Sequence, residues 1–309
     1  AGEYFVIEAD EYERMFLGLE PWLAVVTNIE MDHPDCFAGL DDVRAAFAAF
    51  LAQVRPDGLA VVCGDCAQAR LAAQAAGIRA LLYGEGEHND VRVRDIVAHG
   101  AEGIAFTLDA VGESVYCTLP LSGRHNALNA TAALLAGRAA GVPLRQGAEL
   151  LAGYQGVGRR AEMKGEAGGV VVVDDYAHHP TQIRATIAAM RQRYPGRRLL
   201  VLFQPHTYSR TRALFGDYAA SFGEADVVLV LDVYRARSKE QDTIGSAELV
   251  AAMVHPDAHH VPELAQAETW LAEHVRPGDL VLTLGAGDGY LVGERLLRRL
   301  EEQGHERSA

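Results

Sequence analysis

The stretch VVVDDYAHHP, residues 171–180, places a run of valines directly before two carboxylates, an aromatic ring and two imidazoles. The valines predict a buried β-strand, and Pro180 suits the first turn of a helix, where its missing N–H is not needed. A strand that leads straight into a helix is the repeating unit of parallel α/β sheets, which bind ligands at the carboxyl ends of their strands. The polar cluster after Val173 therefore predicts a ligand-binding edge.

The next apolar run repeats this arrangement. Residues 199–203 predict a second buried strand, and the segment QPHTYSRTR follows at residues 204–212. Neighbouring parallel strands would bring His178, His206 and Arg210 to the same edge of the sheet. We predict that these three side chains line a pocket for a carboxylate and an amine.

Short β-rich runs alternate with amphipathic helical stretches along the rest of the chain, as in parallel α/β layers. Strands are predicted at residues 4–7, 22–27, 59–63, 79–83, 103–109, 114–119, 170–174, 199–204, 227–233 and 279–284. Helices are predicted at residues 40–54, 66–76, 126–140, 143–153, 181–193, 210–221, 246–254, 264–275 and 291–303. Consecutive strand-like segments in residues 85–119 predict a small antiparallel patch. We place a domain boundary after this patch, near Ser122, and predict two α/β domains, 1–122 and 123–309.

The composition describes a globular chain with room for two cores, because 49% of its 309 residues are hydrophobic and 23% are charged. A net charge of −14 argues against a nucleic-acid or anionic-membrane partner. No apolar run approaches the ~18 residues of a membrane span, and the acidic first residues are unlike a signal peptide. We therefore expect a cytoplasmic protein. The chain opens without Met, almost directly on a strand-like run, which predicts that it starts inside a domain.

Two strand exits in the first half offer carboxylates and an imidazole. The segment EADE occupies residues 8–11, and TNIEMDH occupies residues 27–33. Hard divalent ions prefer oxygen ligands, a neutral His can complete the shell, and Mg²⁺ is the natural candidate. The alternative is that these acidic residues are solvated caps. The lone CGDC at residues 63–66 has no second ligand pair, which favours small residues at a strand exit over a zinc or redox site.

Three further motifs carry polar chemistry. GRHNALNA, residues 123–130, puts Asn126 and Asn129 on one face of a helix's first turn, either as polar caps or as hydrogen-bonding groups for an adenine ring. GVGRR, residues 156–160, follows a tight turn with two guanidinium groups suited to phosphate oxygens or to a surface ion pair. LGAGDGY, residues 284–290, lacks the third glycine of a dinucleotide fingerprint, which argues against an NAD site.

In this order, EADE, TNIEMDH, GRHNALNA, GVGRR, VDDYAHHPT and QPHTYSRT make the chain similar to the Mur ligases of bacterial cell-wall synthesis. The match covers nearly all 309 residues. The resemblance implies an α/β fold in which a partial central ATPase-type domain precedes a C-terminal Rossmann-like domain. It also implies an ATP-dependent amide ligase. Residues 34–60 contain no lysine, which fits the branch that joins L-alanine to UDP-N-acetylmuramate rather than the branches with a carbamylated Lys there.

The resemblance assigns a role to particular residues. Glu8 and His33 match the ligands of a Mg²⁺ ion. Contacts with the adenine and ribose of ATP fall on Asn126, Asn129 and Asp175. The contact with its γ-phosphate falls on Arg160. The amino-acid pocket falls on His178, His206 and Arg210, with His178 as the suggested general base. Some members of the family carry Arg after the QPH triplet, where this chain has Thr207.

The chain departs from the family pattern in one large respect. The family's central domain begins with a Gly-rich phosphate loop that contains Gly-Lys-Thr, whereas the first lysine here is Lys164. The family's N-terminal UDP-binding domain is likewise unmatched. We therefore expect a fragment that needs the missing N-terminal portion of the same ligase and is inactive alone. Two rivals stay open: a ligase that joins murein tripeptide to the same UDP-sugar, and a non-catalytic nucleotide-binding module.

Overall fold

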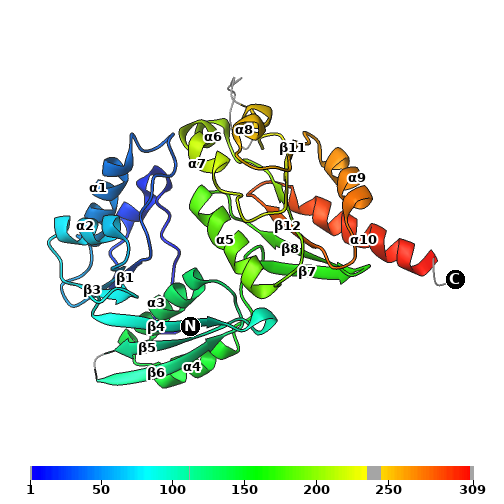
Figure 1. The fold of residues 1–309 in the computed structure, drawn as a ribbon. Coiled ribbons are helices and arrows are strands. Elements are labelled where there is room, and N and C mark those ends of the chain that lie inside the picture. The colour runs from blue at the N-terminus through cyan, green and yellow to red at the C-terminus, as the bar shows by residue number, and fades with distance from the viewer. Residues whose placement is uncertain (1, 111, 235–244, 307–309) are drawn as a thin grey trace. The chain divides into compact units, whose positions relative to one another are not determined.

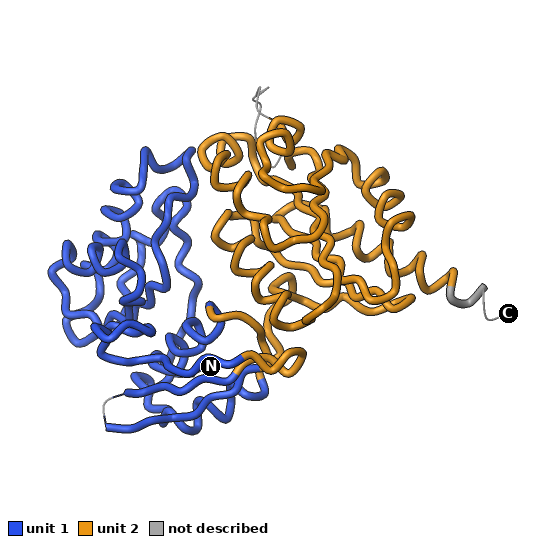
Figure 2. Tube along the Cα trace, viewed as in Figure 1, with its two compact units in different colours: residues 1–97, 105–119, 125–153 blue, residues 98–104, 120–124, 154–309 orange. Residues whose placement is uncertain are grey.

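The computed structural model describes residues 2–110, 112–234 and 245–306. The chain folds into two compact units, shown in Figure 2. Unit 1 comprises residues 1–97, 105–119 and 125–153, and unit 2 comprises residues 98–104, 120–124 and 154–309. Each unit is built around one six-stranded sheet. In the described parts of the chain, no helix is long and apolar enough to cross a membrane.

The sheet of unit 1 has its strands in chain order, and Figure 1 labels all of them except β2. They are β1 (Leu23–Val26), β2 (Leu59–Cys63), β3 (Ala80–Gly84), β4 (Val91–Ala98), β5 (Ile104–Ala110) and β6 (Glu113–Leu119). The first four run parallel. The connections from β4 to β5 and from β5 to β6 are too short for a parallel crossover, so these strands are antiparallel neighbours. This confirms the predicted break in the alternation at residues 85–119.

Five helical segments accompany this sheet: η1 (Tyr12–Gly18), α1 (Leu40–Leu51), α2 (Ala67–Ala75), α3 (Arg124–Ala139) and α4 (Leu144–Ala152). The apolar sides of α1 and α2 cover one face of the parallel strands, where Phe50, Leu51 and Ala72 pack with Val26 and Val62. The two adjacent strands are apolar on this face because every second side chain points to it.

One strand prediction for this half of the chain is corrected by the structure. Residues 4–7 belong to none of the strands in the described part of the chain, and Phe5 and Val6 are 87% and 92% exposed. An apolar run becomes a strand only where a neighbouring strand accepts its backbone hydrogen bonds. The boundary predicted near Ser122 does not coincide with the division into units, because α4 packs on β6 and residues 125–153 therefore stay with unit 1.

The sheet of unit 2 has the order β11-β10-β9-β12-β8-β7. The strands are β7 (Glu162–Ala167), β8 (Val170–Asp175), β9 (Leu199–Phe203), β10 (Val227–Val230), β11 (Ala258–His260) and β12 (Leu280–Leu284). All are parallel except β7, which pairs antiparallel with β8. The helices are α5 (Pro180–Arg193), α6 (Tyr208–Ala213), α7 (Phe215–Ala219), α8 (Ser246–Ala252), α9 (Leu264–His274) and α10 (Tyr290–Glu306), with the short η2 (Gly100–Glu102).

Helices cover both faces of this sheet, which explains why β8, β9, β10 and β12 are buried at every position. Val171 and Val173 of β8 face the core that contains Ile183 and Ile187 of α5. Val170 and Val172 face the opposite core, which contains Val292 and other residues of α10. This doubly wound α/β layering confirms the Rossmann-like fold class (Figure 1). The order of strands brings the exits of β8, β12 and β9 side by side.

Candidate functional site

Asp175, the last residue of β8, anchors two turns at the carboxyl edge of the sheet. Its Oδ1 accepts the N–H of Ala177 at 2.7 Å, and its Oδ2 accepts the N–H of Ala161 at 2.8 Å. Burial raises the pKa of the Asp175 carboxyl, although the two N–H groups and the charge of Arg160 act in the opposite direction. The predicted nucleoside contact therefore also holds its own loop in place.

Arg160 lies in the turn that Asp175 holds. Its side chain is exposed, and its guanidinium lies 5.7 Å from the ring centroid of Tyr176. Among the described residues this guanidinium forms no hydrogen bond or ion pair. An exposed guanidinium of this kind can form a forked hydrogen bond with an anionic ligand, and its contact with phosphate stays a prediction.

The three predicted amino-acid contacts lie together at the exits of β8 and β9. The ring centroids of His178 and His206 are 6.1 Å apart, and Arg210 Nη1 lies 3.2 Å from His206 Nδ1. His178 Nδ1 lies 3.0 Å from the carbonyl oxygen of Tyr176. Because a carbonyl only accepts, Nδ1 carries the proton of the neutral ring and Nε2 carries its lone pair. This tautomer suits a base at Nε2.

Thr207, which stands where some Mur ligases carry Arg, has a structural role. Its backbone is left-handed, with φ of +66°, and its hydroxyl accepts the N–H of Arg210 at 3.4 Å to cap α6. This cap fixes the start of the helix that carries Arg210, which is only 4% exposed.

The glycine-rich loop after β12 is fastened by a residue that the sequence analysis did not single out. Gln204, at the exit of β9, donates from Nε2 to Asp288 Oδ1 and accepts the N–H of Gly289, each at 2.9 Å. Gly285 has φ of +134°, and a Cβ there would lie 2.6 Å from the carbonyl oxygen of Gln204. Gly285, Gly287 and Gly289 all lie beside Gln204, and because they have no side chain the exits of β9 and β12 can approach closely.

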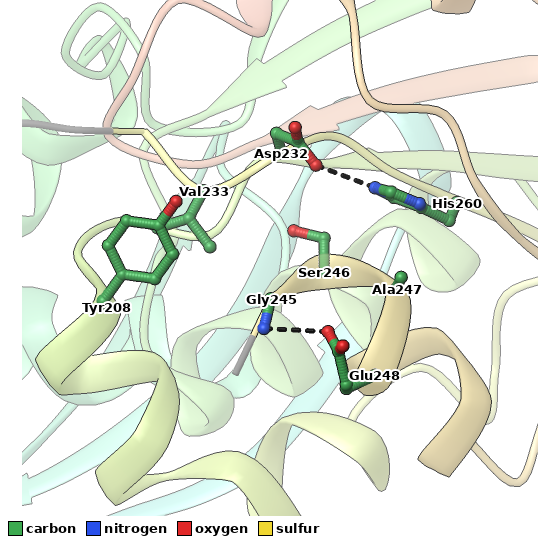
Figure 3. A pocket seen from close by; sticks show the side chains of 8 residues that line it. All are labelled: Tyr208, Asp232, Val233, Gly245, Ser246, Ala247, Glu248 and His260. Carbon is green, nitrogen blue, oxygen red and sulfur yellow. Dashed lines mark hydrogen bonds and ion pairs between the residues drawn. The ribbon is translucent and has the colours of Figure 1, made fainter. Parts of the chain in front are cut away.

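A shallow pocket of about 280 Å³ opens farther along the same edge, as shown in Figure 3. It is lined by Tyr208, Asp232, Val233, Gly245, Ser246, Ala247, Glu248 and His260. His260 Nε2 lies 2.8 Å from Asp232 Oδ1, and Glu248 Oε2 accepts the N–H of Gly245 at 2.9 Å. None of these residues belongs to the predicted site.

In unit 1, the loop after β1 carries His33. Its Nε2 lies 3.2 Å from Glu11 Oε1 and 3.9 Å from Asp32 Oδ2. The hydrogen bond with His33 lowers the pKa of the Glu11 carboxyl. Glu8, the predicted partner of His33, is exposed. In the described ranges, no group of three His, Cys, Asp or Glu side chains is placed to hold a metal ion.

The predicted contacts with ATP are divided between the units. Asn126 and Asn129 lie in the first turns of α3 in unit 1, whereas Arg160 and Asp175 belong to unit 2. His125, which directly precedes Asn126 in α3, is a residue that the sequence analysis did not single out. Burial lowers the pKa of its imidazole, which favours the neutral ring.

Fold and site together define a two-domain α/β protein whose second domain is doubly wound and presents polar strand exits to a ligand. The description "Mur ligase middle domain" fits residues 1–137, and "Mur ligase, glutamate ligase domain" fits residues 159–287. The chain belongs to the Mur ligase family.

Two similar proteins are both named UDP-N-acetylmuramate–L-alanine ligase. The one from Thermobifida fusca is 41% identical over 97% of this chain and 66% of its own length. The one from Roseiflexus sp. strain RS-1 is 41% identical over 96% of this chain and 67% of its own length. The chain thus spans about two thirds of these relatives.

Two solved structures share the fold. UDP-N-acetylmuramate-alanine ligase MurC from Thermotoga maritima gives a TM-score of 0.77 at 23% identity, covering 96% of this chain and 63% of that one. MurF ligase from the same organism, solved in complex with ADP, gives a TM-score of 0.72 at 19% identity. The match covers 95% of this chain and 65% of that one.

Proposed function

We propose that this chain carries the catalytic middle and C-terminal domains of an ATP-dependent ligase that joins L-alanine to UDP-N-acetylmuramate in the cytoplasm. The observation that carries the proposal is the exposed guanidinium of Arg160, held beside Asp175 at the carboxyl edge of a doubly wound sheet. Relatives of that name match the chain over nearly its whole length.

The reaction proceeds by acyl activation in this proposal. A lactyl carboxylate oxygen attacks the γ-phosphorus of ATP and releases ADP, and the alanine amine then attacks the acyl phosphate and expels phosphate. Arg160 binds the γ-phosphate by charge and a forked hydrogen bond. Asn126, Asn129 and Asp175 contact the nucleoside.

The amino acid binds at the exits of β8 and β9. Arg210 and His206 hold its carboxylate, and Nε2 of His178 takes a proton from its ammonium group. The Nδ1 contact with the Tyr176 carbonyl fits this role, because it leaves the lone pair on Nε2.

Glu8 and His33 are the proposed holders of Mg²⁺. The loop offers donor types that suit a hard cation, since carboxylates of Glu11 and Asp32 lie beside the His33 imidazole, although no three such side chains of the described residues are placed to hold an ion. Such an ion would neutralise negative charge on the transferred phosphoryl group.

A chimera tests the activity. The N-terminal part of the Thermobifida fusca relative that precedes the matched region is joined to residues 1–309, and phosphate release is measured with ATP, UDP-N-acetylmuramate and either L-alanine or murein tripeptide. We expect release with L-alanine, lost in Arg160→Ala. Release only with tripeptide favours the recycling ligase, and a folded chimera that is inactive with both favours a nucleotide-binding module.

A further inference from the structure

The two adjacent arginines of the GVGRR turn have opposite surroundings. The guanidinium of Arg160 forms no hydrogen bond or ion pair with the described residues, whereas that of Arg159 is fully engaged with the protein. Their side chains are chemically the same, and only the family resemblance assigns the γ-phosphate to Arg160. The structure separates them.

Arg159 fastens the turn to two strand exits. Its Nε donates to Asp174 Oδ2 at 2.8 Å, and its Nη2 donates to the carbonyl oxygen of Gly285 at 2.8 Å. The Asp174 side chain is 1% exposed, and its second oxygen accepts the hydroxyl of Thr283 at 2.7 Å. A buried carboxylate in this position needs the guanidinium as its counter-charge.

Two aromatic rings and the backbone complete this attachment. The guanidinium carbon of Arg159 lies 4.9 Å from the ring centroid of Tyr176 and 4.5 Å from that of Tyr290. The backbone N–H of Arg159 donates to Glu162 Oε2 at 2.8 Å, and its carbonyl accepts the N–H of Tyr176 at 2.7 Å. Arg159 has φ of +59°, a left-handed conformation that non-glycine residues keep only where their surroundings impose it.

These contacts bear directly on Arg160. Arg159 holds the turn on one side of Arg160, and the bond from the Ala161 N–H to Asp175 holds it on the other. We infer that Arg159 is a positioning residue, which presents Arg160 to the γ-phosphate of a nucleotide without touching it. This inference rests on the proposed function.

The test compares a nucleoside triphosphate with a diphosphate. The chimera that carries the N-terminal part of the Thermobifida fusca relative is titrated with Mg²⁺ plus the imido analogue of ATP, and separately with Mg²⁺ plus ADP, in calorimetric or NMR titrations that reach millimolar ligand. We expect Arg160→Ala to lower the affinity for the analogue at least tenfold and the affinity for ADP less than twofold. The lysine of Arg159→Lys cannot reach Asp174 and Gly285 together. This variant should lower the affinity for the analogue about fivefold and leave the affinity for ADP unchanged. The double variant should bind the analogue no worse than Arg160→Ala, because coupled effects do not add.

Arg198→Lys is the matched control. Arg198 also pairs with a buried carboxylate, Asp279, and with a carbonyl, that of His274, but it precedes β9 at the opposite edge of the sheet. Arg198→Lys should lower the melting temperature without changing the ratio of the affinities for the ATP analogue and for ADP. Arg159→Lys is chosen because Arg159→Ala risks misfolding, and thermal unfolding verifies that each variant is native.

The outcomes separate the two ideas. If Arg159→Lys weakens ADP and the analogue equally, or if its effect adds to that of Arg160→Ala, Arg159 serves stability alone and the inference is overturned. If Arg160→Ala leaves both affinities unchanged, or if the unchanged protein binds neither nucleotide, the proposed function fails and the inference fails with it.

Discussion

Replacing Asp175 by Asn removes one oxygen from a carboxylate that holds the candidate site together. The Asp175 Oδ1 and Oδ2 atoms each accept a backbone N–H, from Ala177 and Ala161. The carboxamide keeps one acceptor and turns an NH₂ group toward the other N–H. A hydrogen bond to a charged group contributes about 1.5–3 kcal/mol, and a buried donor left without an acceptor costs about 1–3 kcal/mol.

We expect the free energy of unfolding of unit 2 to fall by about 2–4 kcal/mol, after allowing for the one retained bond and for relief of carboxylate burial. For a domain of this size, 1 kcal/mol shifts the melting temperature by about 2–4 °C, so the shift should be roughly 4–16 °C. Thermal unfolding followed by circular dichroism measures it. The control is Asp217→Asn, at an exposed position, which should change little.

The pH dependence gives this prediction its sign. The folded-state pKa of Asp175 is raised above that of the unfolded chain, so the folded state binds more protons between the two values. The stability that this group contributes is complete below the unfolded pKa and is lost as the pH rises through the folded pKa. The difference in the free energy of unfolding between the wild type and Asp175→Asn should therefore become smaller from pH 4 to pH 7. A gap under about 0.5 kcal/mol, the usual range of surface substitutions, or one that widens with pH, refutes the reasoning.

Three more predictions follow from single features. Gly285→Ala should lose at least about 2 kcal/mol in urea unfolding, because a Cβ would meet the Gln204 carbonyl at 2.6 Å, whereas Gly216→Ala has open space and should not lose stability. The wild type should lose stability as the pH falls below about 6.5, since burial lowers the folded pKa of His125 and the unfolded chain takes up the proton first. His125→Gln should reduce the slope of the free energy of unfolding against pH between pH 7.5 and 5.5. An unchanged slope contradicts this prediction. Residues 1–309 alone should release no phosphate with ATP and L-alanine, because they contain no Gly-rich loop with lysine; measurable release would be contrary.

Periodicity predicted the sheets well, because a strand covered on both faces is apolar at every position. The run from Val171 to Val173 therefore identified β8 and, with Pro180, the start of α5. Residues 4–7 are likewise apolar but are exposed, since an apolar run does not say whether a neighbouring strand is present. The division into compact units departs from the boundary predicted near Ser122, because the packing of α4 on β6 is a tertiary contact.

The clustering of His178, His206 and Arg210 could be predicted because strand exits of one sheet share an edge. The role of Arg159 in fastening the turn could not. The hydrogen bond from Arg159 to Gly285 spans 126 residues of sequence, and no local pattern encodes it. The approach of Glu11 to His33 likewise depends on the path of a loop.

The most direct test of acyl activation follows oxygen atoms through the reaction. UDP-N-acetylmuramate labelled with ¹⁸O in both oxygens of its lactyl carboxylate is supplied to the chimera with ATP and L-alanine, and the released phosphate is examined by mass spectrometry or ³¹P NMR. Attack of the carboxylate on the γ-phosphorus followed by expulsion of phosphate carries one ¹⁸O atom into each phosphate formed, and the account predicts this result. Amide product accompanied by phosphate without ¹⁸O would contradict it.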